Sequence, residues 1–357
     1  MDFGIFNIMQ QRDRSKSAKA VFDEAAEQTI LAEEMGFDRA WYAEHHFSNY
    51  SLCPSPLMMA AHMAGRTRNI RLGTAVVVAS LYTPARLLAE IGMVDTLSNG
   101  RLDLGIGVGY QRYEFERFGA ELDEAREVTG EMLELIRLGL GQSVFEYQGK
   151  HLQQLRSSIS CRPIQKPTPP IWYAGSVAEH LRWLARHDHT LCISGVLGGV
   201  SRMKAQREQF EKAAVAEGKD PAKIKVGLFR LAFVSKNKKD VEHYVNCALY
   251  QQRLAVSLKT RREKVTDNYV VEEQPYDEEP TIEAIMRNLP VGDVDTCIEK
   301  VVRMIRELKP KHLAIQTQLG DMEHKKSLQS MELWTGQVIP GVMKELGLER
   351  KRLAVAV

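Results

Sequence analysis

Short apolar segments alternate with longer amphipathic segments along most of the chain. The first apolar segment covers residues 3–8, and the segment after it places apolar side chains three or four positions apart until Gly36 ends the pattern. The short segment has the length of a buried strand, and the longer one has the period of a helix with one buried face. Repeated pairs of this kind favour a parallel sheet whose strands are joined by helices.

The alternation continues through the chain and predicts about eight β–α units, the number found in a (β/α)8 TIM barrel. We therefore expect an α/β fold made of one domain over residues 1–357. The expected strands cover residues 3–8, 40–43, 70–78, 101–109, 171–174, 190–194, 225–234 and 312–317. The expected helices cover residues 18–35, 57–65, 84–97, 112–140, 176–186, 203–217, 239–258, 293–308 and 327–346.

Two stretches interrupt this rhythm and are interpreted as insertions. After the fourth strand and its helix, residues 144–155 have the pattern of a hairpin, and a proline-rich stretch then leads into the fifth strand. After the seventh strand, residues 261–290 are rich in charge, contain Pro275 and Pro280, and show no clear period. A long segment of this kind is typical of a mobile lid.

Composition and charge narrow the class of protein. Hydrophobic residues make up 44% and charged residues 26%, as in ordinary globular proteins. Lys and Arg (48) nearly balance Asp and Glu (46), so there is no broad basic surface for nucleic acid. The five cysteines form no CxxC pair, which argues against a disulfide framework and a zinc ribbon. We find no export signal and no apolar stretch of the roughly 20 residues that span a bilayer, so we expect a cytoplasmic protein without a membrane partner.

The polar run Glu44-His45-His46 directly follows the second expected strand. Catalytic groups of TIM barrels project from the C-terminal ends of strands, so this run lies on the active face. Acid–base chemistry, metal binding and packing are all open roles for histidine there. Successive residues of an extended chain point to opposite sides, so Glu44 and His46 share one side, and a three-ligand metal site from this run alone has poor geometry. Residues 187–189 (His-Asp-His) precede the sixth strand, so we assign them to the opposite, structural face and predict no metal site.

Two further segments combine small residues with strand ends. Residues 105–111 read Gly-Ile-Gly-Val-Gly-Tyr-Gln, which departs from the GxGxxG dinucleotide fingerprint. These glycines permit either a tight turn or the close approach of a flat ligand to the backbone. Residues 172–176 read Trp-Tyr-Ala-Gly-Ser and open a helix. Free N–H groups and the Ser176 hydroxyl there suit a phosphate, and Ser176 equally suits the role of an ordinary helix N-cap.

Together these segments resemble the bacterial luciferase-like, flavin-dependent monooxygenases over nearly the whole chain. The most specific segment is the EHHF run at residues 44–47, which resembles the luciferase α subunit. The other segments that carry the resemblance are residues 41–43, Pro56 with residues 60–62, residues 72–76, Asp95, residues 100–101 and 104–107, residues 330–333 and residues 338–340.

The resemblance implies a reaction and its cofactor. Reduced FMN would bind at the strand ends as a diffusing co-substrate supplied by a flavin reductase, and it would react with O2 through a C4a-peroxyflavin that oxygenates an organic substrate. His45 would act as the acid or base near the flavin, with Glu44 and His46 in support or at a subunit contact. The resemblance further implies a non-prolyl cis peptide between Ala75 and Val76 beneath the flavin ring.

The same resemblance assigns the remaining cofactor contacts. Gly107 and Tyr110 would line the flavin ring, and the ribityl phosphate would bind at Ala174, Gly175 and Ser176.

The chain departs from luciferase at three positions in or beside these segments. Val108 stands where luciferase has a phosphate-binding arginine, and Glu179 stands where it has a threonine. A different cation would have to replace the arginine, with His180, Arg182 and Arg261 as open candidates. Gly107 replaces a cysteine, which puts light emission in doubt.

Our leading hypothesis is a two-component FMN-dependent monooxygenase acting on a small or medium hydrophobic substrate, such as an aldehyde, a ketone or a natural-product intermediate. The alternatives are an F420-dependent oxidoreductase on the same barrel, a flavin-binding relative without turnover, and a metal-dependent isomerase or hydrolase. We also expect a homodimer, in which the small residues Ala60, Ala61, Ala64 and Gly65 would allow close packing on a second copy.

Overall fold

The barrel is closed by eight parallel strands. The computed structural model describes residues 1–349. The sheet order β3-β2-β1-β15-β10-β9-β8-β5 returns on itself because β3 also pairs with β5, and every neighbouring pair is parallel. This confirms the predicted (β/α)8 fold. The strands are β1 (Asp2–Asn7), β2 (Arg39–Tyr42), β3 (Arg71–Thr74), β5 (Leu102–Gly107), β8 (Ile171–Ala174), β9 (Thr190–Ser194), β10 (Lys225–Leu231) and β15 (His312–Gln316).

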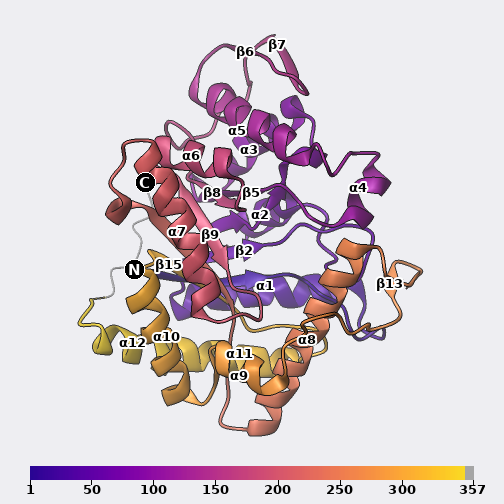
Figure 1. Cartoon of the computed structure of the whole chain (residues 1–357), viewed down its shortest axis with the longest axis vertical. Coiled ribbons are helices and arrows are strands. Elements are labelled where there is room, and N and C mark those ends of the chain that lie inside the picture. Colours follow the sequence, from indigo (N-terminus) through magenta and orange to yellow (C-terminus); the bar gives the residue numbers. More distant parts are fainter. Residues whose placement is uncertain (350–357) are drawn as a thin grey trace.

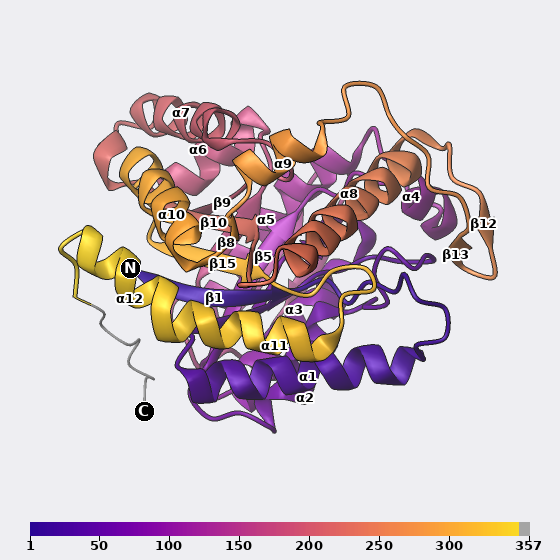
Figure 2. The same cartoon turned by 90° about the horizontal axis from the view of Figure 1, so that it is seen from below.

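Helices surround the barrel and bury their apolar faces against it (Figures 1 and 2). The helices that follow the strands are α1 (Ala18–Met35), α2 (Pro56–Ala64), α3 (Pro84–Leu97), α4 (Arg112–Phe118), α5 (Ala125–Gly141), α6 (Ala178–Arg186), α7 (Val200–Ala216), α8 (Lys238–Thr260), α10 (Val294–Leu308), α11 (His324–Leu333) and α12 (Ile339–Glu345). In this described part of the chain, none of the helices combines the length and apolar character needed to cross a membrane.

Aromatic side chains fill the barrel interior, and glycines make room for them. Trp41 and Trp172 pack edge to face with ring centroids 4.9 Å apart. A Cβ atom at Gly73 would lie 2.1 Å from the Trp41 ring, and one at Gly227 would lie 2.5 Å from the Trp172 ring. Glycine at these strand positions therefore allows two indoles to occupy one barrel.

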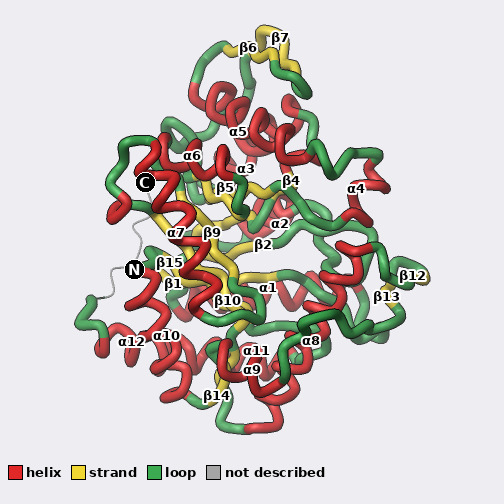
Figure 3. Tube along the Cα trace, in the orientation of Figure 1, coloured by secondary structure: helices red, strands yellow, loops and turns green. Residues whose placement is uncertain are grey.

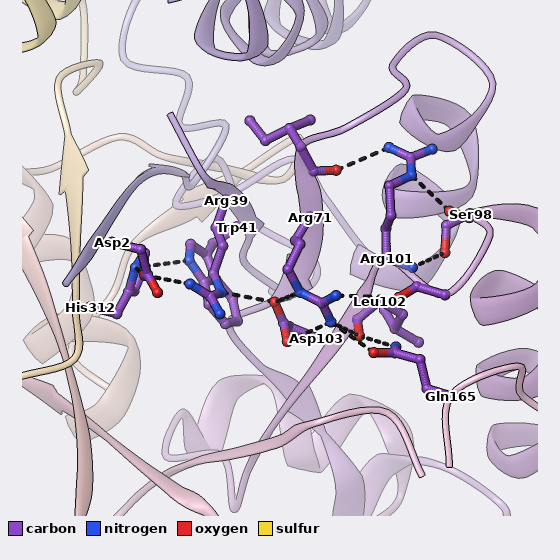
Figure 4. Close-up of polar contacts among 12 residues, drawn as sticks. Asp2, Arg39, Trp41, Arg71, Ser98, Arg101, Leu102, Asp103, Gln165 and His312 are labelled. Atoms are coloured by element: carbon purple, nitrogen blue, oxygen red, sulfur yellow. Dashed lines mark hydrogen bonds and ion pairs between the residues drawn. The ribbon is translucent and has the colours of Figure 1, made fainter. Parts of the chain in front are cut away.

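A buried polar network ties together the N-terminal ends of neighbouring strands (Figure 4). The Asp103 carboxylate on β5 accepts from Arg39 Nε on β2 at 2.9 Å and from Arg71 Nε on β3 at 2.8 Å. Farther along, Trp41 Nε1 donates to His312 Nε2 at 2.9 Å, and His312 contacts Asp2. The charged residues at this end of the barrel stabilise the fold, as expected for the N-terminal face of a TIM barrel, which lies opposite the active-site face.

Three predicted elements differ from those observed. The helix expected over residues 112–140 is interrupted after α4, where Gly119 adopts a φ of +65°. The strand expected over residues 70–78 divides into β3 and the short β4 (Val77–Val78). The expected strand at residues 225–234 likewise continues from β10 into β11 (Phe233–Val234), which pairs with β14 (Val291–Gly292). Apolar content alone does not show the two strand breaks, because Thr74 and Val77 beside the first, and Leu231 and Phe233 beside the second, are all buried.

The C-terminal helix also departs from its prediction. It starts at His324 rather than at residue 327, and a π-helical stretch at Trp334–Val338 separates α11 from α12. Trp334 and Val338 are both buried, so the stretch keeps its apolar face on the barrel.

Both predicted insertions are present. The first holds the hairpin β6 (Phe145–Gln148) and β7 (Gln153–Ser157). The second, residues 261–290, contains the small hairpin β12 (Val265–Thr266) and β13 (Tyr269–Val270) and the helix α9 (Ile282–Asn288), joined by loops (Figure 3). Three of its side chains, Val270, Ile285 and Leu289, are buried against α8 and its neighbours. The segment is thus packed on the barrel in this structure, and its mobility stays a prediction.

Candidate active site

A cavity of about 610 Å³ opens at the C-terminal ends of the strands. It is lined by residues that follow all eight barrel strands or end them, as expected for a TIM-barrel active site. Of the site residues predicted from the sequence, the cavity lining includes Glu44, His45, Ala75, Val76, Gly107, Tyr110, Ala174, Gly175 and Ser176. His46 lies behind this lining and contacts Glu44.

His45 is held by a carboxylate that the sequence analysis missed. Glu114 on α4 lies 3.0 Å from His45 Nδ1, and the same Oε1 atom accepts from the His46 backbone N–H at 2.7 Å. A carboxylate acts only as an acceptor, so Nδ1 carries the proton and Nε2 is left to contact a ligand. Tyr50 packs edge to face on the imidazole with ring centroids 4.6 Å apart. The ring is therefore fixed in both orientation and tautomer.

Glu44 points to the side of the run opposite to His45, as strand alternation predicts. Its Oε1 atom lies 3.0 Å from His46 Nε2, and its Oε2 atom accepts from the Val78 N–H at 3.1 Å and the Tyr82 hydroxyl at 2.9 Å. Burial raises the pKa of Glu44, although the contacts with His46, Val78 and Tyr82 favour its charged form. Glu44 thus fastens the His46 side of the run to the loop after β3.

One wall of the cavity is built from backbone and small side chains. The Ala75–Val76 peptide bond is cis, which agrees with the geometry implied by the resemblance. A Cβ atom at Gly107 would lie 2.5 Å from Val76 Cγ2, so only glycine fits there without a shift. Gly109 has a φ of +83°, and a Cβ atom there would lie 2.7 Å from both Phe115 and Val78. These glycines keep the wall flat and close to the cavity.

The loop before α6 forms one end of the cavity. The N-cap of α6 is Val177, without a side-chain cap hydrogen bond, so the sequence-based alternative of Ser176 as the N-cap is wrong. Ser176 lines the cavity instead, beside the free N–H groups of the first helical turn. Arg126, at the start of α5, lines the cavity together with Ser176 and Val177.

Arg126 is a cation that the sequence analysis overlooked. None of the three candidates named there, His180, Arg182 and Arg261, lines the cavity. His180 is buried and hydrogen-bonded to the Tyr173 hydroxyl at 2.7 Å, and burial lowers its pKa. Arg261 contacts Glu116 at 2.9 Å and also Glu263. Among the described residues, Arg126 takes part in no ion pair, and its guanidinium is available to an anion.

The rest of the cavity is mostly apolar with a few polar groups, among them the cations Arg230 and Lys259. Phe6, Ile8, Val196, Phe229 and Leu231 supply apolar surface. Gln251 and Gln316 also line it, and Gln316 Oε1 is buried without a hydrogen-bond partner among the described residues. The only carboxylates in the lining are Glu44 and Glu114, within the part of the chain that is described. Such a pocket favours a mostly apolar molecule with one or two polar groups.

Comparison with known proteins agrees with this geometry. The model of the family described as luciferase-like monooxygenase matches residues 1–311. The uncharacterized protein y4vJ of Sinorhizobium fredii is 43% identical over 347 residues, covering 97% of this chain and 99% of its own. The oxygenase component of the flavin-dependent trigonelline monooxygenase of Acinetobacter baylyi is 26% identical over 311 residues, covering 84% and 85%.

Solved structures extend the likeness to the whole fold. Monooxygenase RslO1 from Streptomyces bottropensis superposes with a TM-score of 0.82 at 22% identity, covering 95% of this chain and 99% of its own. An F420-dependent secondary alcohol dehydrogenase superposes with a TM-score of 0.72 at 16% identity, covering 96% and 98%. At such low identity these structures show the fold alone, whereas the family model covers most of the sequence. The chain therefore belongs to the luciferase-like monooxygenase family.

Proposed function

We propose that the chain is the oxygenase component of a two-component monooxygenase that uses reduced FMN and O2. The observation that carries this proposal is the cavity at the strand ends, which brings together His45, the Ala75–Val76 wall and the loop at Ser176. Catalytic His45, supported by Glu44 and His46, stands at one part of the lining, and anion-binding groups stand at another.

The residues present fit FMN. The flat wall at Val76 and Gly107 suits the face of an isoalloxazine ring, and Tyr110 lines the same region. Ser176, the N–H groups at the start of α6 and Arg126 suit a phosphate. Arg126 would thereby supply the phosphate-binding cation that luciferase has at the position of Val108. The bound, reduced flavin would supply the electrons that activate O2.

The chain's own side chains would protect and steer this chemistry. His45 Nε2 can hold or deliver a proton at the flavin edge, because Glu114 keeps the Nδ1 proton on the other side of the ring. The apolar lining at Phe6, Phe229 and Leu231 would keep water away from the reacting atoms. The same lining supports a small or medium hydrophobic substrate, such as an aldehyde, a ketone or a natural-product intermediate.

The partners follow from the same proposal. The trigonelline monooxygenase relative is named as an oxygenase component, which supports a separate flavin reductase as the source of reduced FMN. We further propose a cytoplasmic homodimer.

Rapid mixing tests the proposal without knowledge of the substrate. Protein and reduced FMN are combined without oxygen and then mixed with O2, and flavin oxidation and H2O2 release are followed together. We expect the bound flavin to release H2O2 more slowly than free flavin, and the His45→Ala variant to shorten this delay. Reduced FMN that does not bind, or that reacts as fast as free flavin, would sink the proposal. A substrate screen for oxygen-dependent product, with H2O2 measured alongside, then identifies the substrate class.

F420-dependent hydride transfer is the second candidate, because an F420-dependent dehydrogenase shares the fold. Direct comparison of the dissociation constants for reduced FMN and F420 separates the two functions. Tighter binding of F420, with substrate reduction in the absence of O2, would favour this candidate.

A further inference from the structure

A second cluster of chemically active side chains lies outside the catalytic cavity. His243 and Cys247 are four positions apart on α8, so their side chains project from the same face of the helix. Asp321, in the loop between β15 and α11, meets them from the other side. None of the three lines the catalytic cavity.

The three potential ligand atoms are spaced for a single metal ion. Cys247 Sγ lies 3.1 Å from Asp321 Oδ1 and 3.8 Å from His243 Nε2, and His243 Nε2 lies 3.4 Å from the same Asp321 oxygen. Usual zinc–sulfur, zinc–nitrogen and zinc–oxygen bond lengths in a tetrahedron place such atoms about 3.4 to 3.6 Å apart. The observed spacings lie within about 0.5 Å of these values.

We propose that His243, Cys247 and Asp321 bind a divalent cation of the zinc type. One thiolate, one imidazole and one carboxylate suit Zn²⁺ and related metals, and water would complete the tetrahedron. The Cys247 thiol donates to the Asp321 carboxylate in this structure, and metal binding would replace that proton and release it to solvent. Because His243 and Asp321 are partly exposed, the ion can enter from solvent.

Arg12 is the main group that competes with this assignment. Its Nη1 atom lies 3.5 Å from Asp321 Oδ1 and 3.9 Å from Cys247 Sγ. Its shorter contacts are elsewhere, at 2.8 Å to both Asn246 and Glu273, and it lies over the Tyr250 ring. Arg12 therefore lies beside the three potential ligand atoms of His243, Cys247 and Asp321 and not between them. Its charge offsets part of the ligand charge, so we expect reversible binding that is weaker than in a zinc finger.

The position of the cluster gives the ion a structural consequence. It would clamp α8 to the loop after β15, and Gln251, one helical turn beyond Cys247, lines the catalytic cavity. The Arg12–Glu273 ion pair connects the same region to residues 261–290. A bound ion would thus stiffen one side of the cavity entrance.

The sequence did not reveal this cluster because its third ligand is remote. Cys247 and Asp321 are 74 positions apart, and the His243–Cys247 spacing alone has no specificity. The sequence-based expectation of no metal site rested on residues 44–46, on residues 187–189 and on the absence of a CxxC pair, and it did not consider ligands that come together from α8 and the loop after β15.

Cobalt titration of the full-length protein tests the proposal. Co²⁺ replaces Zn²⁺ in tetrahedral sites, and a coordinated thiolate gives an intense near-ultraviolet charge-transfer band. We expect one equivalent of Co²⁺ to produce this band, and Zn²⁺ to abolish it by displacement. The Cys247→Ser variant should lose the band, whereas Cys161→Ser, which changes a half-buried thiol elsewhere, should keep it.

Exposed ligands provide a second test that does not alter the buried thiol. We expect His243→Ala and Asp321→Asn each to weaken Zn²⁺ binding by about tenfold or more, while both variants keep the melting temperature of the metal-free protein. In the wild type, Zn²⁺ should raise the melting temperature and slow hydrogen exchange in α8. No charge-transfer band, or a band that survives in Cys247→Ser, would overturn the assignment.

Discussion

Glu114 contacts both histidines that follow β2 although it belongs to the helix after β5. Its side chain is almost fully buried and accepts from His45 Nδ1 and from the His46 backbone. A buried carboxylate with two N–H donors fixes the direction of its partners more strongly than a neutral group does. Glu114 is therefore a positioning residue for His45.

We predict that Glu114→Gln speeds H2O2 release from the complex with reduced FMN by about tenfold, the effect of roughly 1.4 kcal/mol on the barrier. The amide keeps the shape of the side chain but is neutral, so its hydrogen bonds to His45 Nδ1 and to the His46 N–H are weaker than those of the carboxylate and hold the imidazole less firmly. Rapid mixing with O2 measures the change. Glu116→Gln, on the exposed side of the same helix, is the matched control. Equal rates in the two variants would contradict a positioning role.

Arg126 is the residue on which the assignment of the phosphate end depends. We predict that Arg126→Ala weakens binding of reduced FMN by roughly tenfold, because a charged hydrogen bond to the phosphate is lost. Binding of reduced riboflavin, which lacks the phosphate, should not change. Arg182→Ala, which alters an exposed cation outside the cavity lining, serves as the control. Equal losses for both flavins would show that Arg126 acts on the protein and not on the phosphate.

Neither Glu114 nor Arg126 could be found from the sequence. His45 and Glu114 are 69 positions apart, and both new residues occupy charged helical segments that resemble solvent-exposed faces. The glycine and histidine positions were predicted because strand ends in a TIM barrel converge on one face. Glu114 and Arg126 lie on α4 and α5, on either side of the break at Gly119. Their place beside the strand ends could therefore be predicted only if that break were known.

Strands β2, β3 and β5 share the Asp103 network at the N-terminal face. Burial alone would raise the pKa of Asp103, but the attraction of Arg71 and Arg39 and their hydrogen bonds outweigh it and lower the pKa. A carboxylate whose pKa is lower in the folded state stabilises the fold above its unfolded pKa of about 3.9. That contribution is lost as the pH falls through the folded pKa.

We predict that Asp103→Asn lowers the free energy of unfolding at pH 7 by about 3 kcal/mol, because the buried Arg39 and the half-buried Arg71 lose their common partner. The difference from wild type should hold down to about pH 5 and shrink below about pH 4. Urea unfolding across this pH range measures it. Asp123→Asn, at an exposed position, should change little. A difference that grows on acidification would contradict the assigned sign.

Order and type of the main elements followed from the sequence, since buried strands and amphipathic helices have different periods. The interruptions within two predicted helices, at residues 119–124 and 334–338, did not follow from the sequence. Residues 334–338 keep the buried apolar side chains Trp334 and Val338 at helical spacing, and residues 119–124 lie within a longer charged stretch that was predicted to be one helix. Tertiary packing decides where such a helix widens or stops. The packing of Val270 and Ile285 within residues 261–290 was equally hidden, because charge dominates that segment.

On the scale of the whole molecule, the open question is how a second copy would bind. The small residues predicted to face a partner do not all do so, since Ala60 and Ala64 are buried against the chain's own core. That part of the prediction is wrong. Met58 on α2 and Met93 and Leu97 on α3 are instead exposed, with 73%, 55% and 51% of their surface accessible, and the two helices contact each other. Large exposed apolar side chains on neighbouring helices are typical of a subunit interface.

We predict that the wild type sediments as a dimer and that the double variant Met58→Glu/Met93→Glu sediments as a monomer, because four charges would enter each symmetric interface without partners. The barrel itself should be unaffected, so circular dichroism and FMN binding report whether the variant is folded. Leu155→Glu, at an equally exposed apolar residue of the β6–β7 hairpin, should remain a dimer. A wild type that stays monomeric at all concentrations, or a Leu155→Glu variant that dissociates, would place the interface elsewhere. Dissociation without loss of FMN binding would further show that each cavity is complete within one chain.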